Sequence, residues 1–229
     1  MKLRKNVFAA CVALALSGAV QAEVVALTQL TGLAGGTLAG TGVYKADLST
    51  LSVGTILSIQ IADNSSGLGG AAGQFSGFDL DAIKLSSTDC ATAACAAGAV
   101  GLAVFDFVGG TVFAPGAQRT PADPRLFGTT GTGLAVDNSI ATLGSFDGEN
   151  TTVTPFGFLS MGDNGVISFN LTAAVSTSGM FLYIGEVGDN GEVAAGSIRV
   201  NSNRVPEPGS LALAALALLG AGAARRKTA

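Results

Sequence analysis

The chain has 229 residues, of which 12 are basic, 16 are acidic and none is histidine. The lack of histidine excludes Ser-His-Asp triads, Cys-His dyads and most zinc hydrolase sites. Residues 23–204 hold six basic and 15 acidic residues, a net charge of −9, because the other six basic residues lie near the two ends. A body with this charge repels nucleic acid and anionic lipid, so we expect no nucleic-acid partner.

The first 22 residues have the three parts of a secretory signal peptide. The basic start consists of Lys2, Arg4 and Lys5. Residues 7–16 form an apolar run that is too short to span a bilayer, which favours a removable signal over an anchor left in place. The small residues that follow, ending at Ala22, are typical of a signal-peptidase cleavage site. We expect cleavage after Ala22, so that the mature chain starts at Glu23.

The body, residues 23–204, is rich in Gly, Thr, Ser, Val and Ala, which predicts many short strands joined by tight turns. The strand signals lie at residues 43–44, 51–61, 78–85, 100–107, 143–146, 156–159, 166–171, 180–187 and 195–200. The apolar alternation in 78–85 changes phase near Ala82, which predicts a β-bulge. Residues 100–107 are apolar enough for a central strand, whereas the three prolines in 111–133 predict a long loop.

Two turns carry Asn-Gly, at residues 163–165 and 189–192, and this pair supplies the positive φ angles that hairpins need. Eight to ten short strands at such spacing favour an all-β fold, an antiparallel β-sandwich that is jelly-roll-like. We expect one domain over residues 23–204, flanked by an N-terminal signal helix (residues 1–22) and a C-terminal hydrophobic helix within residues 205–229.

Two cysteines remain after Cys11 leaves with the signal peptide. Cys90 and Cys95 enclose four residues and can pair in the oxidising environment outside the cytoplasm. A small loop of this kind gives a stabilisation of only about 2 kcal/mol. A metal site is the alternative, but two thiols without histidine are a poor zinc set. The sequence therefore favours a Cys90–Cys95 disulfide.

Few side chains suggest catalysis. Asp79 and Asp81 lie two apart on a predicted strand, so their side chains share a face at a spacing of about 7 Å. That spacing falls in the broad range of glycosidase carboxylates. Sugar clefts, however, use aromatic stacking surfaces, and the chain has no Trp and only Tyr44 and Tyr183. We therefore expect no catalytic residues and no enzyme activity.

Calcium is the better candidate ligand, because carboxylate and amide oxygens suit a hard cation. The oxygen-bearing residues are Asp79, Asp81, Asp163, Asp189 and Glu192. Neither Asn-Gly turn matches the EF-hand loop, and ordinary turn chemistry is the alternative that the sequence favours. No cofactor is expected otherwise.

The C-terminus has three consecutive parts. The tripeptide Pro206-Glu207-Pro208 is followed by the uncharged residues 209–224 and then by Arg225, Arg226 and Lys227. The prolines hold the backbone extended. A helix over the 16 uncharged residues would reach roughly 24 Å, a little short of a hydrocarbon core. The basic cluster would stay in the cytoplasm, which leaves the body on the other side of the inner membrane.

These three parts resemble the PEP-CTERM sorting signal. The resemblance implies recognition by an exosortase, a membrane-embedded cysteine protease of Gram-negative bacteria, with cleavage near Pro206-Glu207-Pro208. It also implies a link to exopolysaccharide, biofilm or extracellular matrix. It covers about 25 residues and says nothing about the body. An ordinary tail anchor is the alternative.

Two functions remain open at this point. The first is a non-enzymatic exported protein, held in the inner membrane by its tail helix and delivered after processing to the cell surface or matrix. The second is a carbohydrate-binding module, with calcium as a possible aid, that contacts the exopolysaccharide through Asp79, Asp81 and the two Asn-Gly turns.

Overall fold

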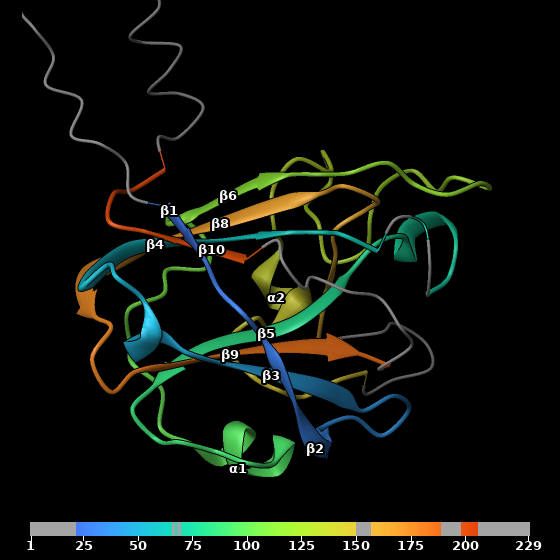
Figure 1. Ribbon diagram of the computed structural model, residues 1–229. Coiled ribbons are helices and arrows are strands. Elements are labelled where there is room, and N and C mark those ends of the chain that lie inside the picture. Colours follow the sequence, from blue (N-terminus) through green and yellow to red (C-terminus); the bar gives the residue numbers. More distant parts are fainter. Residues whose placement is uncertain (1–21, 66, 68–69, 150–156, 189–197, 206–229) are drawn as a thin grey trace, which may run out of the picture.

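A computed structural model describes residues 22–65, 67, 70–149, 157–188 and 198–205. Its body is a sandwich of two antiparallel five-stranded sheets (Figure 1). The first sheet has the order β1 (Ala22–Val24), β10 (Ile198–Asn201), β4 (Thr55–Ala62), β8 (Val166–Ser176) and β6 (Thr111–Ala114). The second sheet has the order β2 (Thr28–Ala34), β3 (Thr41–Asp47), β9 (Phe181–Val187), β5 (Asp79–Ser86) and β7 (Leu159–Ser160). The predicted antiparallel sandwich is confirmed.

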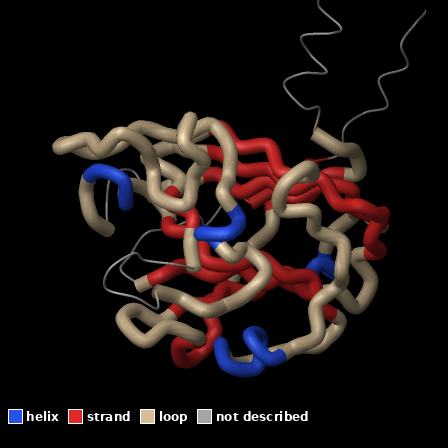
Figure 2. The backbone as a smooth tube through the Cα atoms, turned by 180° about the vertical axis from the view of Figure 1, so that it is seen from behind, coloured by secondary structure: helices blue, strands red, loops and turns tan. Residues whose placement is uncertain are grey.

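The strand order is that of a jelly roll. The row β1-β10-β4-β8 faces the row β3-β9-β5-β7, and from β3 onward each strand lies in the opposite sheet from the one before it. β6 and β2 extend the two rows at their edges. Figure 2 shows the two stacked sheets from behind, with long connecting loops on that side.

The helices of the described part are short. They are η1 (Leu48–Thr50), η2 (Gly73–Phe75), α1 (Ala93–Gly98) and α2 (Asn138–Ala141). None of the helices among the described residues has the length and apolar character needed to cross a bilayer. The two predicted terminal helices fall in residues 1–21 and 206–229, outside the described part.

The turn at residues 163–165 does not close a hairpin. Asn164 has a positive φ of 65°, as the sequence predicts. The turn nevertheless leads from β7 in one sheet to β8 in the other, so it is a crossover between sheets. A local turn signal fixes the backbone direction but carries no information on which strand becomes the neighbour. The second predicted turn, residues 189–192, lies outside the described residues.

The main core fills the space between the sheets with aliphatic side chains, among them Ile59, Ile61, Ile167, Leu182, Ile184 and Val200. The predicted bulge in β5 is present. The register with β9 shifts between Leu80 and Ile83, and both of these side chains point into the core. The extra residue leaves the Ile83 N–H without a ladder partner, and the carbonyl of Leu143 accepts it at 3.0 Å.

Two predicted strands are wrong. Residues 143–146 follow α2 and form no strand, although Leu143 is fully buried. Residues 100–107 form no strand either, and Val100 is 85% exposed. This segment crosses from one sheet to the other, since Leu102 N–H donates to Leu85 of β5 while the Val104 carbonyl accepts from Thr172 of β8.

The apolar character of residues 100–107 serves packing at the side of the sandwich. Phe105 and Phe107 stack on each other at 5.6 Å, and both meet the edge of the Phe169 ring. Hydropathy alone does not separate such a cover from a central strand. The place beside β8 goes instead to β6, which occupies the start of the predicted loop 111–133.

α1 covers the outer face of the second sheet (Figure 1). Ala93 and Ala96 are fully buried there in one cluster with Tyr183 of β9. Lys84 of β5 donates to the carbonyls of Ala96, Ala97 and Ala99 at 2.8–3.0 Å. A cation at the C-terminal end of a helix satisfies free carbonyls and opposes the helix dipole, so Lys84 fixes α1 on the sheet.

Candidate functional site: the processing junction

The predicted signal-cleavage point and the last described residues before the tail lie at the same end of the first sheet. β1 pairs with β10 so that Ala22 lies opposite Asn201 and Glu23 opposite Val200. The predicted signal-cleavage bond, between Ala22 and Glu23, therefore lies inside an edge strand. Its neighbour β10 is the last strand before the tail. Figure 1 shows β1, β10 and β4 together at this end of the molecule.

Glu23 is held by the loop that precedes β4. Its carboxylate accepts hydrogen bonds from Ser52 N–H at 3.0 Å, Ser52 Oγ at 3.0 Å and Val53 N–H at 3.1 Å. The two backbone donors, more than any other group, hold the pKa of Glu23 below its usual value. The first residue of the expected mature chain is thus a structural part of the folded body.

Residues 201–205, called here the tail root, are tied to the sheet by side chains. Asn170 of β8 makes two of these hydrogen bonds. Its Oδ1 accepts from Val205 N–H at 2.7 Å, and its Nδ2 donates to the Val205 carbonyl at 3.0 Å. One amide side chain thus pairs with both backbone groups of the residue before Pro206, as a neighbouring strand would.

Two further contacts hold the tail root. Ser58 of β4 donates to the Asn203 carbonyl at 2.7 Å and accepts from the Asn201 amide at 3.2 Å. Arg204 donates to the carbonyls of Leu171 and Thr172 at 3.0 and 3.2 Å. The attachment therefore spans β4 and β8.

The surface around the tail root is hollowed. A cavity of about 190 Å³ is lined by Ala22, Gln60, Arg199, Asn201, Asn203, Arg204 and Val205. It joins the described end of β1 to the end of the tail root. A second hollow of about 380 Å³, with Asp106 and Asn170 in its wall, also includes Arg204.

Asp81, a candidate calcium ligand, is fully buried and bound within the fold. It accepts from Thr41 Oγ1 at 2.6 Å and from Gly148 N–H at 3.1 Å. Burial, with a contribution from the charge of Asp147, raises the pKa of Asp81 to about 7. Burial also raises the pKa of Asp147, against hydrogen bonds from Thr142 at 3.0 and 3.2 Å. Two carboxyl groups that interact in this way favour sharing a proton.

Asp79, two residues earlier at the start of β5, has different partners. Its carboxylate accepts from Ser160 Oγ of β7 and forms part of the wall of a cavity of about 220 Å³. Glu149 and the rings of Phe75 and Phe158 share this wall. The cavity combines carboxylates with aromatic surface.

Of the other candidate ligands only Asp163 is described, and it does not join Asp79 and Asp81. Asp163 lies 3.4 Å from the guanidinium of Arg119, an ion pair. Asp189 and Glu192 lie outside the described residues. Within the described ranges, no three acidic, cysteine or histidine side chains gather as a metal would need.

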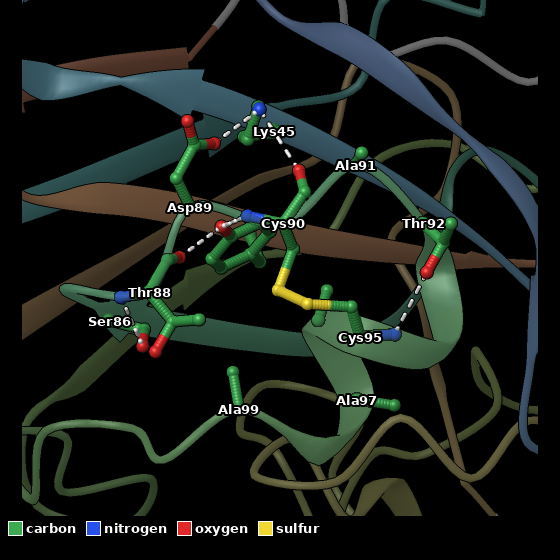
Figure 3. Close-up of a disulfide and its surroundings, with 12 residues drawn as sticks. Lys45, Ser86, Thr88, Asp89, Cys90, Ala91, Thr92, Cys95, Ala97 and Ala99 are labelled. Carbon is green, nitrogen blue, oxygen red and sulfur yellow. Dashed lines mark hydrogen bonds and ion pairs between the residues drawn. A yellow bond between two sulfur atoms is a disulfide. The ribbon is translucent and has the colours of Figure 1, made fainter.

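The predicted disulfide is present between Cys90 and Cys95 (Figure 3). Tyr183 lies beside it, where its hydroxyl accepts from Cys90 N–H at 2.9 Å and donates to the Thr88 carbonyl at 2.6 Å. Thr92 caps the start of α1 by accepting from Cys95 N–H at 3.2 Å. The bridge therefore fixes α1 against the second sheet and has no part in the processing junction.

Sequence reasoning missed four residues of these sites. Asn170 appears in the sequence only as part of an Asn-Leu-Thr triplet, and its partner lies 35 residues away. Ser58 alternates normally in its strand, so nothing separates it from other strand residues. Asp147 and Glu149 lie in a loop whose approach to β5 and to the segment between β2 and β3 depends on tertiary structure.

The fold and the junction define a jelly-roll body that continues from its last strand into a C-terminal sequence with the parts of a processing signal. The family profile of the PEP-CTERM protein-sorting motif matches residues 204–227. The chain thus carries this motif, which is the recognition signal of exosortase and implies a secreted, exosortase-processed protein. No curated protein and no solved structure matches the chain.

Proposed function

We propose that the chain is a non-enzymatic protein of the cell surface or extracellular matrix, associated with exopolysaccharide, that exosortase frees from its tail. The observation that carries the proposal is the sorting motif at residues 204–227, which begins within a hydrogen-bonded tail root. The signal-like residues 1–22 and the acidic body support export. Before processing, the tail helix would hold the body at the inner membrane; cleavage near Pro206-Glu207-Pro208 would release it.

The absence of catalytic activity is also a proposal. It is supported by the lack of histidine and by the engagement of the buried acids: Asp79 with Ser160, and Asp81 with Thr41. Carboxylates that are hydrogen-bonded within the fold in this way stabilise it. An activity of the purified body on the host polysaccharide would contradict this part of the proposal.

The deciding experiment is mass spectrometry of the mature protein from host cells with and without the exosortase. We expect a chain that begins at Glu23 and ends near Pro208 in the normal host, and an intact tail in the deletion strain. Replacing Pro206, Glu207 and Pro208 by alanine should leave the same uncut form in the membrane fraction. A tail that persists through Lys227 in the normal host would overturn the proposal.

A second function, a carbohydrate-binding module, is favoured by one observation. The cavity beside Asp79 brings carboxylates and the rings of Phe75 and Phe158 together, and sugars bind to such combinations of polar and aromatic groups. Calcium would aid binding there only with ligands beyond the described residues. Saturable binding of the host polysaccharide that Phe75→Ala and Asp79→Asn weaken would support it. Binding that EDTA abolishes would support a role for calcium. A titration with Ca²⁺ that gives no heat and no shift in melting temperature would exclude that role.

A further inference from the structure

The tail root is held more firmly than a simple linker requires. The family profile begins at residue 204, yet residues 201–205 are bound by side chains of β4 and β8, strands that lie far earlier in the sequence. The pairing of Asn170 with Val205 repeats the geometry of a β-ladder at the point where β10 itself has ended. The body, and not the tail alone, therefore decides where the chain leaves the sheet.

Proteases bind their substrates as extended strands whose backbone groups are available. Both backbone groups of Val205 are occupied by Asn170, and the Asn203 carbonyl is occupied by Ser58. Pro206 has no N–H and cannot continue the ladder. While the body is folded, three backbone groups of the tail root are thus unavailable to a protease, although Asn203 and Arg204 are exposed. The pairing with Asn170 ends at Val205.

The end of the tail root at Val205 lies only a short stretch of chain before the uncharged segment that would enter the membrane. Only three residues, 206–208, separate the tail root from the uncharged stretch 209–224. Fully extended, three residues span about 10 Å. A tethered body therefore sits close to the membrane surface, with little slack for the protease to choose another bond.

We infer that Asn170 and Ser58 are positioning residues for tail processing: they clamp residues 201–205 to the folded body and so confine cleavage to the chain beyond Val205. This inference rests on the proposed function. It assigns to the body a part in selecting the cleavage site, in addition to the signal carried by the tail.

The first test needs no exosortase. The full chain, purified in detergent micelles, is digested briefly with proteinase K, and the C-termini of the products are read by intact mass. For the unaltered chain we expect ends within residues 201–205 to form only slowly. Asn170→Ala removes both hydrogen bonds to Val205 and should produce ends there about tenfold faster.

Graded variants identify the cause. Asn170→Asp keeps an acceptor for Val205 N–H but loses the donor, so its rate should fall between the two. Ser58→Ala should expose the Asn203 side of the tail root independently. Asn138→Ala is the matched control, because this half-buried residue also binds one backbone N–H, that of Leu143, away from the tail root.

The inference is overturned if the unaltered chain is cut within 201–205 as fast as Asn170→Ala, or if Asn138→Ala opens the tail root equally. Melting of the body is followed for each variant, and Ser58→Ala replaces Asn170→Ala if that chain does not fold.

A second test uses the exosortase host. The mature protein should have one C-terminus beyond Val205, and Asn170→Ala should add shorter forms that end within the tail root. A single unchanged end in Asn170→Ala would overturn the role in processing. If the unaltered tail remains uncut in this host, the proposed function fails, and the proteinase K experiment alone decides whether the clamp exists.

Discussion

Asp63 shows how a single buried carboxylate can organise several loops of this body. It is 5% exposed, and it accepts from the backbone N–H groups of Ser65, Phe78 and Asn164 at 2.9–3.3 Å. These three donors come from separate parts of the chain. The backbone of Asn164, in the Asn-Gly turn itself, is therefore held by a carboxylate 101 residues earlier.

Replacing Asp63 by alanine should lower the free energy of unfolding by about 3 kcal/mol, because three backbone donors lose a charged acceptor in a buried place. Denaturant unfolding of the purified body measures the change. Asp106→Ala is the control, since Asp106 also accepts from two backbone N–H groups but is exposed to water. A loss for Asp63→Ala no larger than for this control would contradict the assignment.

The Asp81–Asp147 pair predicts an unusual pH dependence of stability. The pKa of Asp81 is about 7 in the folded body against 3.8 for the free group, so the folded state binds the proton more tightly. Its contribution is complete below about pH 4 and is lost as the pH rises to about 7. Glu23 and Asp106 act in the opposite sense, because their lowered pKa values cost stability only at more acidic pH.

Melting temperatures measured from pH 8 down to pH 5 should therefore rise. Asp81→Asn imitates the protonated acid and should flatten this part of the profile, while Asp89→Asn, an exposed change near Lys45, should not. A profile of Asp81→Asn that keeps the full slope would show that another group causes it.

At the scale of elements, alternation in the sequence predicted the strands that line the core. β4, β5, β8 and β9 all lie where the sequence places them, and so does the bulge in β5. The failures, residues 100–107 and 143–146, are apolar segments that pack without forming a strand, although Phe105 makes one isolated bridge with Leu171. Hydropathy reports burial, whereas pairing depends on which sheet edges remain vacant, and a sequence does not show this.

The disulfide belongs to one element, α1 and the segment that leads into it. Changing Cys90 and Cys95 to serine together should lower stability by about 2 kcal/mol, because the loop they close is short. Hydrogen exchange should rise in α1 while the core strands β4 and β8 stay protected. Global unfolding in place of this local effect would mean that α1 is essential to the sandwich.

The position of β1 predicts an order of events. The bond between Ala22 and Glu23 is paired with β10, which is synthesised some 175 residues later, and Glu23 is held by Ser52. The signal must therefore be cut before β1 docks. Purified signal peptidase should cleave an unfolded precursor readily and a folded one at least tenfold more slowly. Glu23→Ala should reduce the difference, and equal rates for both forms would contradict the order.

At the scale of the whole molecule, one part of the candidate site could be predicted from the sequence and the other could not. The tail is contiguous, so Pro206-Glu207-Pro208 and its flanks reveal the sorting motif from the sequence alone. The tail root is held by Ser58 at Asn203 and by Asn170 at Val205, and only the jelly-roll order brings these strands and the tail root together. For the metal candidates, residue type suggested a shared site that the structure does not form. Asp81 binds Thr41 and Asp163 pairs with Arg119, at separate places.

The jelly-roll order also predicts which part of the C-terminus the body needs. β10 lies between β1 and β4, and its Ile198 and Val200 side chains are fully buried in the core.

A chain that ends at Val205 keeps this strand and every described contact of the tail root, so its melting temperature should match that of the full chain within about 2 °C. A chain that ends at Gly196 loses two buried aliphatic side chains, each worth about 1.5–3 kcal/mol, and leaves β1 without a partner. We expect this shorter chain to be unfolded by circular dichroism. A folded shorter chain would mean that β10 is an accessory strand, and that release of the tail need not preserve it. A body that keeps its stability on ending at Val205 is what processing beyond the tail root requires, since the product must persist outside the membrane after the tail is gone.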